Sequence, residues 1–83
     1  MNTSLFLQEF RNVEGVLRGR FNMTYLDFEN TVAPPDMKKK MQVCRILRNY
    51  LAHEQDGDTF ISVSLGEIEF LQKLCCYLRN FRG

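Results

Sequence analysis

The sequence of 83 residues contains no apolar run near the roughly 18 residues that a membrane-spanning helix requires. Its first ten residues, MNTSLFLQEF, lack the basic segment and the small-residue cleavage site of a secretory signal. We therefore expect a cytoplasmic protein with no membrane association. The length suits one small domain over residues 1–83, which is either complete or the N-terminal module of a longer protein.

Ligands for metal ions are also scarce. The one histidine is His53, and the three cysteines, Cys44, Cys75 and Cys76, include no pair with CxxC spacing. That spacing is typical of zinc sites and redox motifs, and an odd number of cysteines gives no complete disulfide framework. We expect reduced thiols in a helical core, no metal site and no other cofactor.

A strong net charge is absent too, because 11 basic and 10 acidic residues leave a formal charge of +1. Most nucleic-acid-binding domains are far more basic. The basic residues are nevertheless unevenly placed, and five of them lie close together in the sequence: Lys38, Lys39, Lys40, Arg45 and Arg48. A local basic patch is therefore expected on a nearly neutral protein.

What the sequence does contain is helical periodicity. A first helix, capped by Thr3 or Ser4 and ended by Gly19, is predicted from one apolar stripe. The stripe has spacings of four, three and four residues and consists of Phe6, Phe10, Val13 and Leu17. A short irregular or helical turn near 24–29 follows, and a Pro-Pro pair then precedes a long helix over 35–53.

The C-terminal third predicts an extended connector and one more helix. FISVS, residues 60–64, has the composition of a strand but is too short to form a sheet alone. Ser64 and Glu67 have the S-x-x-E spacing of a capping box, which marks a helix start. The buried face of that helix is expected to comprise Ile68, Leu71, Leu74, Cys75, Leu78 and Phe81. The fold class is therefore all-α, a small bundle of three helices with an extended connector.

The long helix over 35–53 carries a polar stripe. At ~100° per residue, five polar residues fall within about 80° of one another: Lys38, Gln42, Arg45, Asn49 and His53. Apolar residues fill more than half of the remaining circumference, so we expect this helix to be central in the bundle and part of its apolar arc to be buried between subunits.

Arg48 lies outside the polar stripe, about 140° from His53 and among methionines and Cys44. An arginine in such a place either extends its charged end to solvent or holds an anion or carboxylate. On a regular helix the two residues are too far apart to pair, so a joint role requires a frayed last turn or a symmetric dimer. The alternative is an ordinary solvated helix face with cations near its C-terminus.

The segment LRNYLAHE, residues 47–54, resembles the motif of HEPN domains, which are small helical proteins of toxins and RNA-processing systems. That motif is an arginine, a polar residue that is often asparagine, and a histidine after four to six intervening positions. Arg48, Asn49 and His53 match it with four intervening residues. The chain is also similar to the helical module found ahead of CBS domains in some bacterial proteins, where a comparable motif helix is followed by an extended link and a helix like GEIEFLQKL.

The resemblance implies metal-independent cleavage of single-stranded RNA by a homodimer whose two motifs face each other across a cleft. His53 would act as the acid or base, Arg48 would hold the scissile phosphate, and Asn49 would orient the phosphate or the histidine. Other members of the polar stripe could follow the RNA backbone: Lys38, Gln42 and Arg45. A toxin–antitoxin setting with an antitoxin-like partner is also implied.

Many domains that resemble HEPN proteins are not nucleases. The second hypothesis is therefore a non-catalytic dimerisation or adaptor module, whose motif helix packs against a partner or a following ligand-sensing domain. Near-neutral charge favours this adaptor, whereas the intact Arg-Asn-x-x-x-His pattern favours the nuclease.

Overall fold

The computed structural model describes residues 2–53 and 63–81. In chain order the elements are α1 (Asn2–Val16), the π-helical segment η1 (Leu17–Phe21), α2 (Tyr25–Thr31), α3 (Pro35–His53) and α4 (Leu65–Arg79). The described ranges contain no strand, so the all-α prediction is confirmed for them. The bundle has one helix more than predicted, because the segment expected as a turn forms α2.

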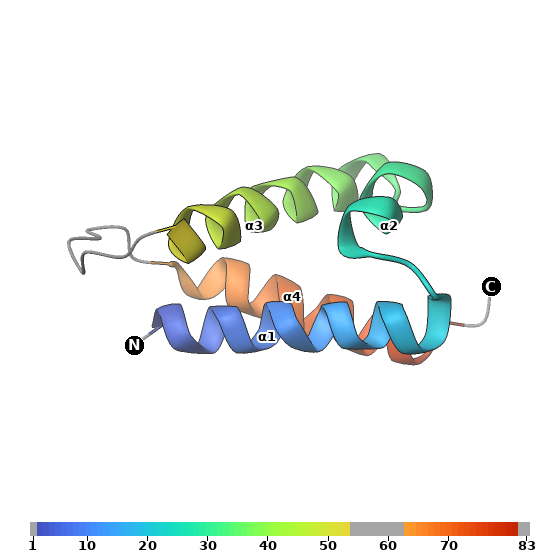
Figure 1. The fold of residues 1–83 in the computed structure, drawn as a ribbon, viewed down its shortest axis with the longest axis horizontal. Coiled ribbons are helices and arrows are strands. Elements are labelled where there is room, and N and C mark those ends of the chain that lie inside the picture. The colour runs from blue at the N-terminus through green and yellow to red at the C-terminus, as the bar shows by residue number, and fades with distance from the viewer. Residues whose placement is uncertain (1, 54–62, 82–83) are drawn as a thin grey trace.

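Two helices that are distant in sequence, α1 and α4, lie side by side and run in the same direction (Figure 1). Gln72 of α4 donates a hydrogen bond to Glu9 at the middle of the two helices, at 3.2 Å, and Arg20 donates to the Phe81 carbonyl beyond their C-terminal ends, at 3.1 Å. α3 runs the opposite way across this pair, and α2 packs on one flank of α3 (Figure 1).

The predicted apolar stripe of α1 is confirmed, since all four of its members are buried: Phe6, Phe10, Val13 and Leu17. The predicted ends of this helix are wrong. The helix begins at Asn2, ahead of Thr3 and Ser4, and continues beyond Val16 as η1, which contains Gly19. It ends at Asn22, whose φ of 52° is left-handed and whose N–H donates to the Leu17 carbonyl. Asparagine tolerates this conformation better than most residues, so it terminates the helix in place of glycine.

Side-chain contacts are found at the starts of both α2 and α4, but only at α2 do they form a helix cap. The Thr24 hydroxyl accepts a hydrogen bond from the Asp27 N–H at 3.1 Å, which satisfies one free donor of the first turn of α2. Ser64 precedes α4, and its hydroxyl donates to the Glu67 carboxylate. α4 therefore begins where the S-x-x-E spacing predicted, but the predicted capping box is not formed: Ser64 and Glu67 meet through their side chains, and the Ser64 side chain makes no capping bond to the backbone.

The buried face of α4 is confirmed, with Ile68, Leu71, Leu74, Cys75 and Leu78 in the core and Phe81 half-buried. Most of the predicted extended connector lies outside the described residues. Its described members are Val63, which is buried, and Ser64. None of the helices in the described ranges has the length and apolar character needed to cross a membrane.

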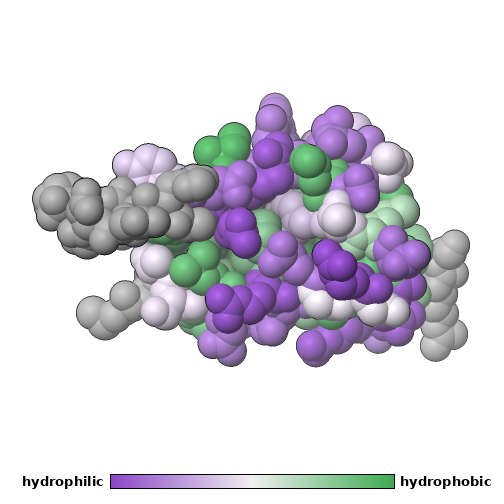
Figure 2. Space-filling model, viewed as in Figure 1, coloured by the Kyte–Doolittle hydropathy of each residue, from purple (hydrophilic) through white to green (hydrophobic). Residues whose placement is uncertain are grey.

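The bounds of α3 match the predicted 35–53, but its expected central position is wrong. Met41 and Cys44 are buried, whereas the other side of the apolar arc is open. The exposed fractions there are 47% for Val43, 55% for Ile46 and 50% for Tyr50. Apolar side chains accordingly show on the surface over α3 in Figure 2. The reason is that α1 and α4 pack chiefly on each other, and α3 rests on the pair with one face only.

Candidate functional site

Two of the three motif residues line one pocket on the flank of α3 that faces α1 and α2. This arginine pocket has a volume of about 240 Å³. Arg48 and Asn49 contribute to it together with six other residues, Phe10, Glu14, Thr24, Tyr25, Leu26 and Arg45. Residues from three helices that are far apart in sequence therefore meet at the Arg-Asn half of the motif.

Arg48 lies over an aromatic ring. Its guanidinium carbon is 5.9 Å from the centre of the Phe10 ring, a cation–π distance. Its Nη1 donates to the Asn49 Oδ1 at 3.4 Å, and the side chain is half-buried. Among the described residues no carboxylate forms an ion pair with it. Two roles were expected for an arginine at this position: extending its charged end to solvent, or holding an anion or carboxylate. Since no described carboxylate pairs with Arg48, its guanidinium is available to an incoming anion.

Arg45 is committed to a different partner. Its Nε and Nη2 donate to the two carboxylate oxygens of Glu29, at 2.9 and 3.1 Å, and Glu29 is only 2% exposed. This bidentate hydrogen bonding raises the pKa of Arg45 above its already high value. The guanidinium charge is thus largely compensated inside the protein. A role for Arg45 on an RNA backbone depends on its remaining N–H groups.

The remaining members of the polar stripe are placed differently. Lys38, Gln42 and Asn49 are exposed on α3, whereas α2 covers the flank on which Arg45 lies. The described helix continues to His53, but the His53 side chain lies outside the described residues. The five-residue separation from Arg48 corresponds to about 140° around a continuous helix. The structure thus brings Arg48 and Asn49 together at the pocket, and leaves position 53 on the side of α3 that Asn49 faces and Arg48 does not.

Tyr25 forms a rigid wall of the arginine pocket. Its ring stacks on Phe10 with the centres 4.3 Å apart, and its hydroxyl donates to the Met41 carbonyl at 2.8 Å. Burial raises the pKa of Tyr25 well above its usual range, and the nearby Cys44 and Glu29 add to the effect. The phenol therefore stays protonated and keeps its hydrogen bond. Arg48 and Tyr25 therefore both lie against the Phe10 ring.

One acidic residue, Glu14 of α1, lines the same pocket and is half-buried. Its carboxylate opposes the entry of an anion, while Arg48 favours it. Because Glu29 compensates the charge of Arg45, the electric field in the pocket is determined by the opposing charges of Arg48 and Glu14. The arginine pocket is consequently close to neutral, and an anion bound there depends on directed hydrogen bonds more than on long-range attraction.

Sequence reasoning did not identify Phe10, Glu14, Tyr25 or Glu29 as residues of the site. Phe10 was assigned to the core by its periodicity, which is correct but incomplete. Glu29 and its partner are sixteen positions apart, a separation that no local pattern connects. A glutamate in a short segment rich in aromatic residues was the one signal in the sequence, and it becomes informative only once α2 is placed against α3 and Glu29 is seen to be buried.

The cysteines agree with the predicted core role in two of three cases. Cys44 and Cys75 are buried, Cys76 is exposed, and all three are free thiols. Burial raises the pKa of Cys44 to about 12, with a further contribution from the Glu67 carboxylate, so this thiol remains protonated at neutral pH. In the part of the chain that the structure describes, no group of three or more histidine, cysteine or acidic residues is placed to hold a metal ion.

No protein-family model, curated protein or solved structure matches this chain. The chemistry of the site therefore rests on its own residues and their geometry. Three features carry it: a half-buried guanidinium over an aromatic ring, a neighbouring amide, and an adjoining pocket of small volume.

Proposed function

We propose that the protein is a metal-independent endoribonuclease of the HEPN type that acts as a homodimer. The observation that carries this proposal is the placement of Arg48. It is half-buried over Phe10, it lines the arginine pocket, and no described carboxylate forms an ion pair with it. A guanidinium held in this way can direct paired N–H groups at a phosphate. Asn49, at 3.4 Å from it, supplies an amide that can orient the same phosphate.

The proposed reaction needs no metal-bound water. The RNA 2′-hydroxyl oxygen forms a bond to the adjacent phosphorus, and the bond from phosphorus to the 5′-oxygen of the next nucleotide breaks. The products are a 2′,3′-cyclic phosphate and a free 5′-hydroxyl. His53 of one subunit accepts the 2′-hydroxyl proton, and His53 of the other gives a proton to the leaving oxygen. Arg48 opposes the negative charge that develops on the phosphate oxygens.

A dimer supplies the geometry that one chain lacks. Within a continuous α3, the motif positions 48 and 53 lie about 140° apart, so one subunit does not present both to one phosphate. Two copies of α3 that face each other would bring Arg48 of one subunit toward position 53 of the other. Ile46 and Tyr50, which are 55% and 50% exposed, lie on the same side of α3 as position 53 and supply apolar contacts for such an interface.

Exposed polar residues of α3 extend the proposed RNA path. Gln42 and Lys38 lie about two and three turns before Asn49, and both are exposed where they can contact the phosphate backbone. Because only a few cations take part, we propose weak binding with a small dependence on salt. Sequence preference would then come from bases held in the cleft, as expected for single-stranded RNA.

The test is incubation of the purified protein with mixed single-stranded RNA in EDTA. Cleavage by the wild type, lost in His53→Ala and Arg48→Ala, is the expected result. Arg79→Ala serves as the matched control, because Arg79 is an exposed arginine at the end of α4, away from the motif helix. RNA left intact by the wild type, or cut equally by wild type and His53→Ala, overturns the nuclease.

A second candidate function is a non-catalytic adaptor that binds an antitoxin-like or sensor-domain partner. The open apolar side of α3, formed by Val43, Ile46 and Tyr50, favours it, because exposed stripes of this kind mark protein interfaces. The same RNA assay separates the two functions. A wild type that dimerises in light scattering but leaves RNA intact is the outcome that selects the adaptor.

A further inference from the structure

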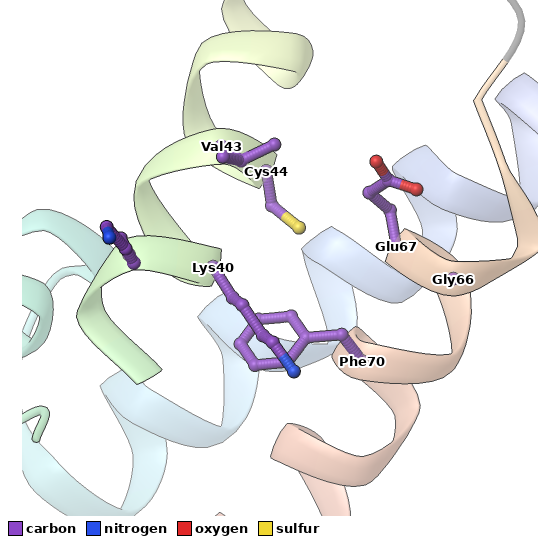
Figure 3. Close-up of a pocket in the computed structure, with 7 residues that line it drawn as sticks. Lys40, Val43, Cys44, Gly66, Glu67 and Phe70 are labelled. Carbon is purple, nitrogen blue, oxygen red and sulfur yellow. The ribbon is translucent and has the colours of Figure 1, made fainter. Parts of the chain in front are cut away.

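A groove runs between α3 and α4 on the flank of α3 opposite to the arginine pocket. It has a volume of about 450 Å³. Figure 3 shows side chains from the two helices converging on it. We call it the α3–α4 groove, and its lining residues are Lys39, Lys40, Val43 and Cys44 of α3 with Gly66, Glu67 and Phe70 of α4.

The floor of the α3–α4 groove is apolar. Val43 is 47% exposed, Phe70 is half-buried, and the buried thiol of Cys44 points between the helices (Figure 3). Gly66 adds no side chain to the α4 side of the groove, so the α4 backbone itself forms the groove surface there. Since the distance between packed helices depends on the side chains at their contact, this surface allows another helix to approach closely.

Helical spacing on α3 indicates what shape covers this floor. Val43, Ile46 and Tyr50 are exposed at spacings of three and four residues, which is a stripe along the helix axis. This stripe borders the α3–α4 groove, so the open surface is long and narrow. Such a surface fits the apolar face of an amphipathic helix laid along α3. α2 already covers the other flank of α3, and the groove is the place where one more helix would complete the bundle.

The charges at the α3–α4 groove indicate the chemistry of that helix. Two lysines, Lys39 and Lys40, line the α3 side, and Lys40 Nζ lies 5.9 Å from the centre of the Phe70 ring. The single acidic lining residue, Glu67, accepts a hydrogen bond from the Ser64 hydroxyl. The surplus of positive charge at the lysine end is complementary to carboxylates on an incoming helix.

We propose that the α3–α4 groove binds an amphipathic helix of a partner protein, with an apolar face on Val43 and Phe70 and carboxylates on Lys39 and Lys40. A second copy of this chain fits the groove less well. A symmetric dimer through this surface would bring together two copies of the groove that each carry a surplus of positive charge, and like charges at an interface are costly. The proposal does not depend on RNA cleavage, because the motif residues of the arginine pocket lie on the opposite flank of α3.

Two synthetic helical peptides of about 18 residues, the length of five turns, test the proposal. They share one leucine-rich apolar face and differ only in flanking positions, which are glutamate in one and lysine in the other. We expect the glutamate peptide to bind the full chain at least about tenfold more tightly by fluorescence anisotropy. Amide chemical shifts should change along Lys39, Lys40, Val43 and Phe70. Equal affinities, or shifts confined to another surface, overturn the proposal.

Charge reversal provides the matched control. Lys39→Glu with Lys40→Glu should reverse the preference between the two peptides. Arg11→Glu with Arg18→Glu changes the net charge equally but alters exposed residues of α1 and η1, so it should leave the preference intact. If both double variants behave alike, net charge alone explains the binding and the proposal fails.

Val43→Glu separates the partner helix from a second copy. This substitution should weaken the binding of both peptides while the circular dichroism spectrum of the protein stays unchanged, because Val43 is exposed and adds little to the core. Concentration-dependent chemical-shift changes at Lys40 and Phe70, lost in Val43→Glu, would show that a second copy occupies the groove, which contradicts the proposal.

Discussion

Arg45 of α3 and Glu29 of α2 form a bidentate ion pair that joins the short helix to the motif helix. The two bonds measure 2.9 and 3.1 Å, and the carboxylate is buried while the arginine side chain is 28% exposed. The pair is therefore asymmetric. Arg45 can reach water if its partner is lost, but Glu29 depends on Arg45 for compensation of its charge.

This asymmetry predicts unequal effects of the two single substitutions. Arg45→Ala should lower the free energy of unfolding by about 3–5 kcal/mol, because it leaves a buried carboxylate unpaired. Glu29→Gln should cost less, since the amide still accepts one hydrogen bond. The double variant Glu29→Leu with Arg45→Met should recover much of the loss. Urea unfolding at neutral pH measures all three, and an Arg45→Ala cost below about 1 kcal/mol would contradict the prediction.

Backbone conformation predicts opposite effects at two positions near the end of the first helix. Gly15 lies inside α1, and an added Cβ would meet nothing within 4 Å, so Gly15→Ala should stabilise by about 0.5–1 kcal/mol. Asn22 has a φ of 52°, so Asn22→Ala should destabilise by about 1–2 kcal/mol, whereas Asn22→Gly should not. Thermal unfolding should show opposite shifts for Gly15→Ala and Asn22→Ala, and shifts of the same sign would contradict the assigned backbone.

Two buried groups predict a loss of stability at alkaline pH. The folded-state pKa of Cys44 is about 12 against a usual value of 9.0, and that of Tyr25 is raised above its usual range. Between pH 9 and about pH 12, the Cys44 thiol has lost its proton in the unfolded chain and has kept it in the folded chain. The free energy of unfolding therefore falls as pH rises from about 9 to 12, by at most about 1.4 kcal/mol per pH unit for Cys44.

The Cys44→Ala variant isolates this effect. It removes the Cys44 contribution, so its free energy of unfolding should fall less steeply than that of the wild type above about pH 9. Urea unfolding in the presence of a thiol reductant, from neutral pH to about pH 10.5, measures the two slopes. Tyr25→Phe should lose about 1 kcal/mol at neutral pH with its hydrogen bond to Met41, and this deficit should shrink above pH 10. Equal slopes in wild type and Cys44→Ala would contradict the assignment.

The elements with strong periodicity were predictable from the sequence. The proline pair and the sustained apolar pattern place α3 at 35–53, and the stripes of α1 and α4 identify their buried faces. α2 was predicted only as a turn or short helix, because seven residues with one cap carry little local signal. Its stability comes from contacts with α3, such as Tyr25 with the Met41 carbonyl, which connect residues sixteen positions apart.

The exposed side of α3 shows a different limit of sequence patterns. The apolar arc of this helix identifies the side chains that are favourably buried, but it does not say whether a neighbouring helix is present to cover them. Met41 and Cys44 meet the core, while Val43 and Ile46 do not. The Arg-Asn half of the site was found through its motif. The aromatic rings beneath it, Phe10 and Tyr25, come from other helices and required the fold.

The opposing charges of Arg48 and Glu14 give the sharpest test of the arginine pocket. If the pocket binds a phosphate of RNA, Glu14→Gln removes a repulsive carboxylate and should tighten RNA binding by about two- to fivefold at low salt. Arg48→Lys keeps the positive charge but loses the planar fork over Phe10, so it should lower cleavage by about 10²-fold or more.

The two variants are informative together because they separate charge from geometry. RNA binding is measured by fluorescence anisotropy with the His53→Ala background, in which no cleavage is expected, and cleavage is measured in EDTA. Glu9→Gln, which neutralises another carboxylate of α1 that bonds to Gln72 of α4, is the matched control and should leave RNA affinity unchanged. If Glu9→Gln and Glu14→Gln tighten binding equally, RNA responds only to net charge. The phosphate would then bind elsewhere than in the pocket beside Arg48.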